Sequence, residues 1–265
     1  MTTTTPRTEV LGDPGHPPPP PRRHPARATT AVLAALLGSA LLAGGAATTW
    51  SRYRADHRPL PPDAAYRKAA SLWHEAPVDG LLPPVVDGPE AGPGGAHRTW
   101  TRIALAPDAD CAAALPADWR AALAATGCTR VLRATYTDST RSSLITVGLV
   151  FTPADAGTMD GLRGRLPVPP AYEYADSRRA AWTATVAAEA PAVVYAVSAF
   201  ADGRAMDAPV PAEEAARPGA TGTVAEAGLG HEAKALATRT EHSLGALVTP
   251  PAATHPQPRR QEASR

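Results

Sequence analysis

The stretch TRVLRATYTDSTRSSLITVGLVF, residues 129–151, decides the fold, because it holds two strand patterns joined by a short polar turn. In its first half the apolar Leu132, Ala134 and Tyr136 alternate with polar residues, which is typical of a strand with one buried face. The second half, from Ser143 onward, is dense in β-branched residues that favour extended backbone. The intervening DSTR has turn composition. We therefore predict an antiparallel hairpin.

The residues before the hairpin predict a strand and a broken helix. TWTRIALA, residues 99–106, alternates as a strand does. Residues 109–127 have helical spacing, because one stripe carries large apolar side chains four positions apart (Leu115, Trp119 and Leu123). Pro116 is tolerated at the first position of a second helical piece, and Gly127 suits a helix C-terminus.

The residues after the hairpin predict a second helix and two more strands. A threonine N-cap, a proline in the first position and a carboxylate in the first turn (Thr152, Pro153 and Asp155) mark a helix that ends near Leu166. Strands follow over 182–188 and 192–200. Residues 203–222 are polar and Pro-rich, so we expect them to be flexible, whereas 231–248 has the apolar spacing of a final helix that packs back on the sheet.

The order of these elements predicts an α+β fold. The succession βαββαββ, followed by a C-terminal helix, most resembles a ferredoxin-like sandwich with both internal helices on one side of the sheet.

The two cysteines, Cys111 and Cys128, both fall inside this domain. An even count beyond a membrane-targeting stretch favours a disulfide, and the alternative is two buried free thiols in a cytosolic protein. An unkinked helix between them would exceed the roughly 7 Å between α-carbons that a disulfide tolerates. We therefore predict a break at or before Pro116 that folds Cys111 back toward Cys128.

A hydrophobic segment precedes the domain. Residues 29–49 carry no charge and are long enough to cross a hydrocarbon core of about 30 Å as a helix. The richest part runs only from Ala31 to Ala43, so a signal peptide cleaved after Ala47 stays open as an alternative. Arginines flank the segment on both sides and hardly orient it. The cysteine pair therefore decides for a cytoplasmic N-terminus and an extracytoplasmic C-terminal domain.

The remaining segments complete the predicted organisation. Residues 1–28 are a disordered Pro/Arg-rich cytoplasmic tail, 50–96 a juxtamembrane helix and linker, 97–248 the extracytoplasmic domain, and 249–265 a second disordered tail. Small residues recur every fourth position in the membrane segment and permit close helix approach, which leaves a weak homodimer open (Ala35, Ser39, Ala43 and Ala47).

Composition and motifs argue against several function classes. A net charge of +1 recruits no nucleic acid. His231-Glu232 resembles the start of an HExxH zinc motif, but position 235 is Ala, so the second ligand is missing. His231 and His242 lie about 16 Å apart along a helix and cannot share an ion. We predict no catalytic, cofactor or metal site, and we assign the aromatic residues to the core (Trp100, Trp119, Trp182, Tyr136 and Tyr195).

The Pro/Arg-rich tail, the membrane segment, the cysteine-paired domain and the late GLGHEA of Gly228–Ala233 together resemble uncharacterised membrane-anchored proteins of Streptomyces and related actinobacteria. GLG-x-EA is also similar to a motif in actinobacterial extracytoplasmic lipoproteins and sensor-type domains, although this chain has no lipobox cysteine. The resemblance implies a tethered extracytoplasmic protein and supplies no catalytic residues.

We therefore expect a non-enzymatic, membrane-tethered interaction or sensor-type domain that is accessory to an envelope assembly. Its partners would be the lipid bilayer, through the N-terminal helix, and an envelope protein. Two alternatives stay open: an envelope hydrolase whose site is assembled from scattered residues, and a secreted small-ligand binder.

Overall fold

The computed structural model describes residues 25–56 and 60–248, with side chains over 36–54 and 60–248. The chain divides into two compact units between Pro59 and Leu60. The predicted tail 249–265 and residues 1–24 of the predicted N-terminal tail lie outside the described residues, while residues 25–28 begin a helix.

The first unit contains one long helix, α1 (Pro25–Asp56), which includes the whole segment 29–49 that we predicted to cross the membrane. Large apolar side chains on its described part are exposed (Leu36, Leu37, Leu41, Leu42, Trp50 and Tyr53). Among the helices within 25–56 and 60–248, none meets the combined length and hydropathy requirements for a membrane span.

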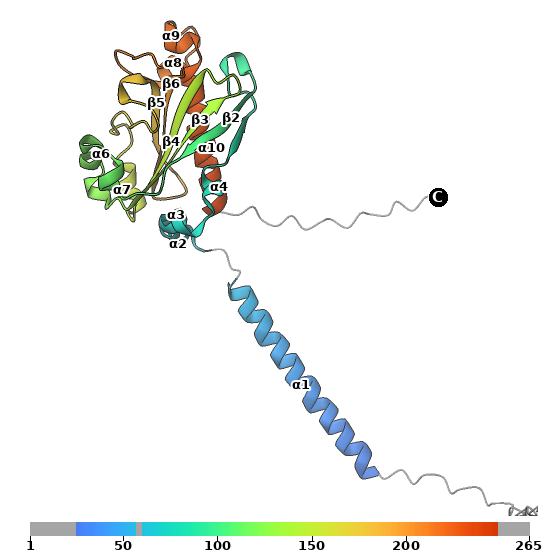
Figure 1. The fold of residues 1–265 in the computed structure, drawn as a ribbon. Coiled ribbons are helices and arrows are strands. Elements are labelled where there is room, and N and C mark those ends of the chain that lie inside the picture. The colour runs from blue at the N-terminus through green and yellow to red at the C-terminus, as the bar shows by residue number, and fades with distance from the viewer. Residues whose placement is uncertain (1–24, 57–59, 249–265) are drawn as a thin grey trace, which may run out of the picture. The chain divides into compact units, whose positions relative to one another are not determined.

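The second unit is an α+β domain built on one seven-stranded sheet (Figure 1). Its strands are β1 (Val85–Gly88), β2 (Arg98–Leu105), β3 (Arg130–Asp138), β4 (Ser143–Phe151), β5 (Arg179–Val186), β6 (Ala192–Phe200) and β7 (Val210–Pro211). They lie in the order β1-β2-β3-β4-β6-β5-β7, and every pairing is antiparallel except that of β5 with β7. The predicted β3–β4 hairpin is confirmed, as are the two later strands, which pair with each other as β5 and β6.

Helices surround the sheet in short pieces, apart from one long helix near the C-terminus. The α-helices of this unit are α2 (Pro62–Lys68), α3 (Leu72–Glu75), α4 (Val78–Leu81), α5 (Cys111–Ala114), α6 (Ala117–Ala122), α7 (Ala156–Asp160), α8 (Ala212–Ala215), α9 (Thr223–Glu226) and α10 (Leu229–Val248). The 3-10 helices are η1 (Ala69–Ser71), η2 (Pro93–Gly95), η3 (Ala124–Thr126) and η4 (Asp176–Arg178).

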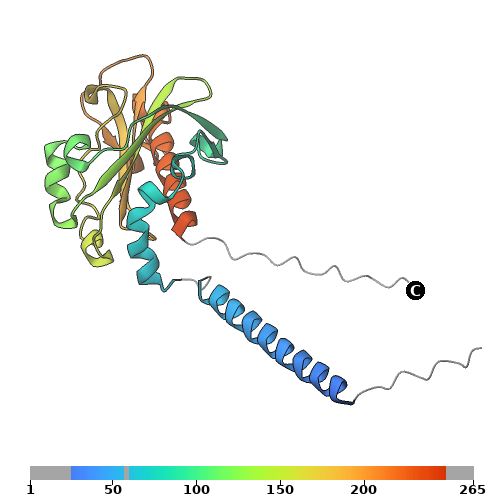
Figure 2. The ribbon, with the colours of Figure 1, turned by 60° about the horizontal axis from the view of Figure 1, so that its bottom comes forward.

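The sheet separates two apolar layers, because successive side chains along a strand point to opposite faces. On one face, residues of β3, β4 and β6 pack with α10, as the prediction for the C-terminal helix required; this layer includes Leu132, Val147, Leu236 and Leu244. On the other face, α5, α6 and α7 cover Val131, Val150, Val193 and Tyr195. Figures 1 and 2 show α10 along one side of the sheet, with α6 and α7 on the opposite side in Figure 1.

One glycine permits close packing at the centre of the sheet. Gly148 of β4 lies opposite Tyr195 of β6. A β-carbon added at Gly148 would lie 2.1 Å from Cζ of Tyr195, so the ring occupies the space that any other residue would need. The ring of Trp119 lies 5.3 Å from that of Tyr195, centroid to centroid, and closes the layer over it.

The strand order corrects the predicted ferredoxin-like topology. That fold needs strands on either side of a helix to run parallel, joined by a crossover. Here β2 and β3 are antiparallel neighbours, with Leu105 opposite Ala134. The physical reason is the break between α5 and α6, where Leu115 has extended backbone. The broken helix cannot carry the chain back along the sheet, so β3 starts beside the end of β2.

The second predicted helix is shorter than expected. Its N-cap is Asp155, whose carboxylate accepts a 2.9 Å hydrogen bond from the Thr158 amide. Thr152 does not cap α7, because its buried hydroxyl donates to the Pro191 carbonyl at 3.2 Å. The helix ends at Asp160, although Leu166 further on is still buried as expected.

Two segments predicted to be linker or flexible belong to the fold instead. Within 50–96, Leu81 and Leu82 are fully buried and β1 joins the sheet. Arg102 fixes this segment by donating to Asp79 at 2.8 Å and to the Leu82 carbonyl. Within 203–222, β7 pairs with β5, and Ala212 is fully buried. Proline-rich composition is typical of linkers in both cases, but each segment covers an edge of the sheet.

Candidate functional site

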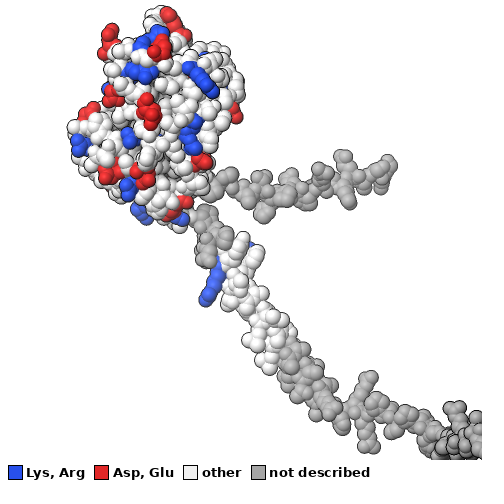
Figure 3. Space-filling model, viewed as in Figure 1, with Lys and Arg blue, Asp and Glu red and all other residues white. Residues whose placement is uncertain are grey.

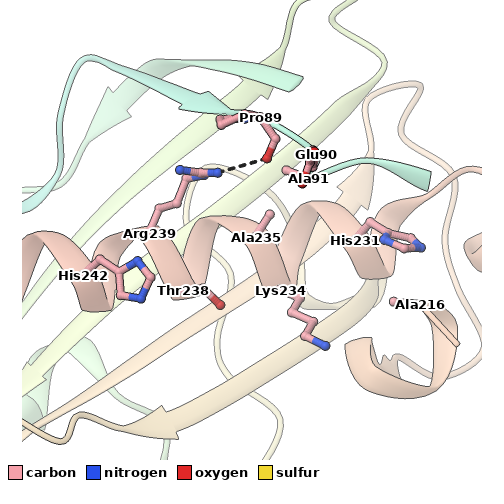
Figure 4. A pocket seen from close by; sticks show the side chains of 10 residues that line it. All are labelled: Pro89, Glu90, Ala91, Ala216, His231, Lys234, Ala235, Thr238, Arg239 and His242. Carbon is pink, nitrogen blue, oxygen red and sulfur yellow. Dashed lines mark hydrogen bonds between the residues drawn. The ribbon is translucent and has the colours of Figure 1, made fainter. Parts of the chain in front are cut away.

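Helix α10 divides its side chains between the core and a surface groove. Ala233, Leu236 and Leu244 are fully buried against the sheet. The neighbouring stripe begins at His231 and continues at three- and four-residue steps to His242, so it lies along one side of the helix. This polar stripe forms one wall of the groove (Figure 4).

The groove has a volume of about 340 Å³ and is formed by three parts of the chain. Helix α10 contributes one wall, the loop after β1 contributes the facing wall, and the residue after α8 contributes one end. Its lining residues are Pro89, Glu90, Ala91, Ala216, His231, Lys234, Ala235, Thr238, Arg239 and His242. Figure 4 shows His231 and His242 toward opposite ends of the helical stripe, with Lys234 and Thr238 between them.

The loop after β1 is held against α10 by backbone and side-chain contacts. Arg239 donates from Nη2 to the Pro89 carbonyl at 3.3 Å, as Figure 4 shows. Gly88 lets the chain pass over Trp100, since an added β-carbon would lie 2.5 Å from the indole ring. Glu90 adopts a left-handed backbone with φ 57°, which turns the loop. The facing wall of the groove is therefore fixed in place.

The charge of the groove is mainly positive. Lys234 and Arg239 are basic residues, and Glu90 is the carboxylate that lines the same groove. Among the described residues, neither Lys234 nor Arg239 forms an ion pair with a carboxylate. Partial burial, together with the positive charges of Lys234 and Arg98, lowers the pKa of His231 below its ordinary value.

A buried carboxylate lies next to the groove, on the sheet side of α10. Glu232 is 4% exposed, and its Oε1 lies 3.3 Å from Nε of Arg98. The indole of Trp100 donates a hydrogen bond to Oε2. Burial raises the pKa of Glu232, the Trp100 and Arg98 contacts oppose that rise, and the charge of Asp138 adds to it. This network joins the first turn of α10 to β2.

The GLGHEA stretch has structural roles that account for several of its residues. Gly228 has φ +74° directly before α10 begins, a conformation that favours glycine. A β-carbon at Gly230 would lie 2.7 Å from Cβ of Ala215, so this glycine lets α8 approach α10. Glu232 anchors the helix to β2, and His231 beside it faces the groove.

The predicted disulfide is confirmed. Cys111 and Cys128 are bonded, with their α-carbons 6.1 Å apart, and the chain breaks before Pro116 as predicted. Both residues belong to the apolar layer on the face opposite α10. The bond therefore joins the two ends of the segment that contains α5 and α6, and it does not border the groove. The predicted core aromatics Trp100, Trp119, Tyr136 and Tyr195 are buried, whereas Trp182 is half-buried.

The groove brings together residues that the sequence did not assign to a site. His231 and His242 line the same groove, but Lys234, Arg239 and Glu90 were not singled out. The signal was present as a polar stripe at helical spacing beside the apolar one, but the facing loop is remote in sequence. Within residues 36–54 and 60–248, no three side chains among His, Cys, Asp and Glu are grouped so as to hold a metal ion.

Basic and acidic side chains of the folded unit are interspersed on the face shown in Figure 3, without one large patch of a single sign.

Comparison with family models, with curated proteins and with solved structures finds no match to this chain. The function therefore has to be inferred from the residues themselves.

Proposed function

We propose that this chain is a membrane-tethered extracytoplasmic interaction or sensor-type domain, with the groove along α10 as its contact surface. The observation that carries the proposal is the Cys111–Cys128 disulfide in a compact α+β unit. Structural disulfides persist in oxidising compartments and are rare in the cytosol. An extracytoplasmic location of the folded unit is the arrangement in which this bond is stable.

The tether in this proposal is α1, with the N-terminus in the cytoplasm. Its exposed leucines give it an apolar surface that lipid would cover, and Leu41 and Leu42 are the most exposed of these, at 75% and 77%. Trp50 and Tyr53 follow on the same helix, with their rings 6.0 Å apart. Aromatic side chains of this kind are enriched at the membrane–water interface.

A topology reporter tests the proposal. The full chain is fused at its C-terminus either to an enzyme that is active only outside the cytoplasm or to one that is active only inside it. We expect activity from the first fusion alone, and two mutually bonded cysteines in protein purified without reductant. Activity from the cytoplasmic reporter alone, together with two freely alkylated thiols, would overturn the proposal.

Site-specific photo-cross-linking tests the contact surface. A photoreactive residue at Thr238, exposed in the groove, should give a discrete adduct in intact cells. The matched control is the exposed Arg120 on α6, which lies on the opposite side of the sheet. Equal labelling from both positions would count against the groove as the contact surface.

A released small-ligand binder is the second candidate, because the groove volume of about 340 Å³ falls in the range typical of small-molecule sites. The N-terminal sequence of the mature protein separates the two. A mature chain that begins shortly after Ala47 favours the released binder, whereas retention of α1 favours the tether.

A further inference from the structure

We propose that the groove along α10 binds a small ligand that bears a phosphate group. This inference rests on the proposed function, because it takes the groove as the contact surface of the domain. It adds the chemical class of the ligand, which follows from the charges, the hydrogen-bond donors and the size of the groove.

Within the described residues, the two bases of the groove lack a carboxylate partner, as do eight other bases of the folded unit, but these two share one hollow. Six arginines form ion pairs with carboxylates: Arg98, Arg102, Arg130, Arg163, Arg179 and Arg204. Lys234 and Arg239 form none with the described residues, although both line one hollow. An anion in the groove would supply the opposite charge that no described carboxylate gives to Lys234 and Arg239.

The spacing of donors favours phosphate over carboxylate. His231, Lys234 and Thr238 follow one another at three- and four-residue steps, so their side chains are neighbours on one side of the helix. An imidazole, an ammonium group and a hydroxyl can each donate a hydrogen bond. A phosphate monoester offers three strong acceptor oxygens and nearly two negative charges near neutral pH, whereas a carboxylate offers two oxygens and one charge.

The groove also limits the rest of the ligand. Its apolar lining consists of small residues (Pro89, Ala91, Ala216 and Ala235), which offer a short nonpolar wall beside the donors. A volume of about 340 Å³ is at the small end of the range for ligand sites. The carboxylate of Glu90 on the facing loop opposes the anion and so limits its affinity.

The chain offers a direct chemical test, because Lys68 and Lys234 are its two lysines. The full chain in detergent is treated with a limiting amine acylating reagent, and the extent at each lysine is measured by mass spectrometry. The probes are inorganic phosphate and glycerol 3-phosphate, with glycerol and acetate as controls. We expect both phosphates to slow acylation of Lys234 at least about threefold, and to leave Lys68, on α2, unchanged.

Two substitutions of opposite effect accompany this measurement. With glycerol 3-phosphate as titrant, Lys234→Met should weaken binding by roughly tenfold, because it removes one permanent charge from a partly screened site. Glu90→Gln should strengthen binding by roughly threefold, since the opposing charge is lost. Lys68→Met is the matched control and should leave the affinity unchanged. The gain expected from Glu90→Gln cannot result from misfolding.

The outcomes separate this proposal from the one on which it rests. Protection of Lys234 by both phosphates, with opposite effects of Lys234→Met and Glu90→Gln, supports a phosphate site. Absence of protection, equal protection by acetate, or an affinity indifferent to both substitutions overturns it. None of these results alters the C-terminal reporter assay, whose failure would remove the extracytoplasmic assignment while leaving the titration unaffected.

Discussion

Loss of the Cys111–Cys128 bond should destabilise the folded unit by a predictable amount. The bond joins residues 17 positions apart. Closing a loop of that length removes conformational entropy from the unfolded chain that corresponds to about 3 kcal/mol. For a domain of this size, the loss should lower the melting temperature by roughly 6 to 12 °C. The assay is thermal and urea unfolding of the wild type and of Cys111→Ala/Cys128→Ala, followed by circular dichroism.

The single variants supply the internal control. Cys111→Ala and Cys128→Ala each open the same loop, so each should cost about as much as the double variant and their effects should not add. Reductant should destabilise the wild type by the same amount and leave the double variant unaffected. Additive single effects, or a wild type indifferent to reductant, would refute the reasoning, because the stabilisation would then come from side-chain packing.

Three further substitutions test other features of the domain. Burial raises the pKa of Glu232, so the folded state binds its proton more tightly than the unfolded state does, and the free energy of unfolding falls as pH rises above the unfolded-state pKa. Glu232→Gln should remove this fall. Urea titrations from about pH 4 to about pH 8 measure the slope. Asp138→Asn should destabilise by roughly 1 to 3 kcal/mol near neutral pH. Although burial opposes ionisation, hydrogen bonds from Thr140, Ser143 and Ser142 hold the Asp138 pKa at about 2. The stabilisation is therefore present above the ordinary carboxyl pKa and is lost as pH falls toward about 2, where the wild type and the variant should have the same free energy of unfolding. Gly148→Ala should lower the free energy of unfolding by roughly 1 to 3 kcal/mol, because the added methyl group overpacks against Tyr195. Tyr195→Ala should lower it less in the Gly148→Ala background than in the wild type, which a double-mutant cycle measures.

The elements of the fold were predictable where the pattern is local. The β3–β4 hairpin follows from alternation within 129–151, and α10 follows from apolar spacing within 231–248. Asp110 is the N-cap of α5, and its carboxylate accepts from the Ala113 amide at 2.7 Å. Each of these depends on residues a few positions apart, for which side-chain spacing and capping are sufficient.

The topology was not predictable from the same patterns, although one constraint was available. A ferredoxin-like crossover places the ends of its helix at opposite ends of the sheet, whereas a disulfide between Cys111 and Cys128 requires those ends to be adjacent. The two expectations were therefore incompatible, and the disulfide was the correct one.

The groove required tertiary information for a similar reason. Arg239 and Pro89 lie 150 positions apart, and no spacing rule relates them. The polar stripe on α10 is equally consistent with a solvated helix face. Only the position of the loop after β1 converts that stripe into the wall of a hollow.

The pairing of Gly148 with Tyr195 has a consequence for how the strands find each other during folding. A shift of β4 by two residues along β6 would place Thr146 or Val150 opposite the ring, and neither leaves the space that the absent side chain provides. A shift by one residue would exchange the two faces of β4 between the layer packed on α10 and the layer packed on α5, α6 and α7. Gly148 thus excludes competing registers of β4 on β6, although the apolar residues of both strands would otherwise tolerate several registers.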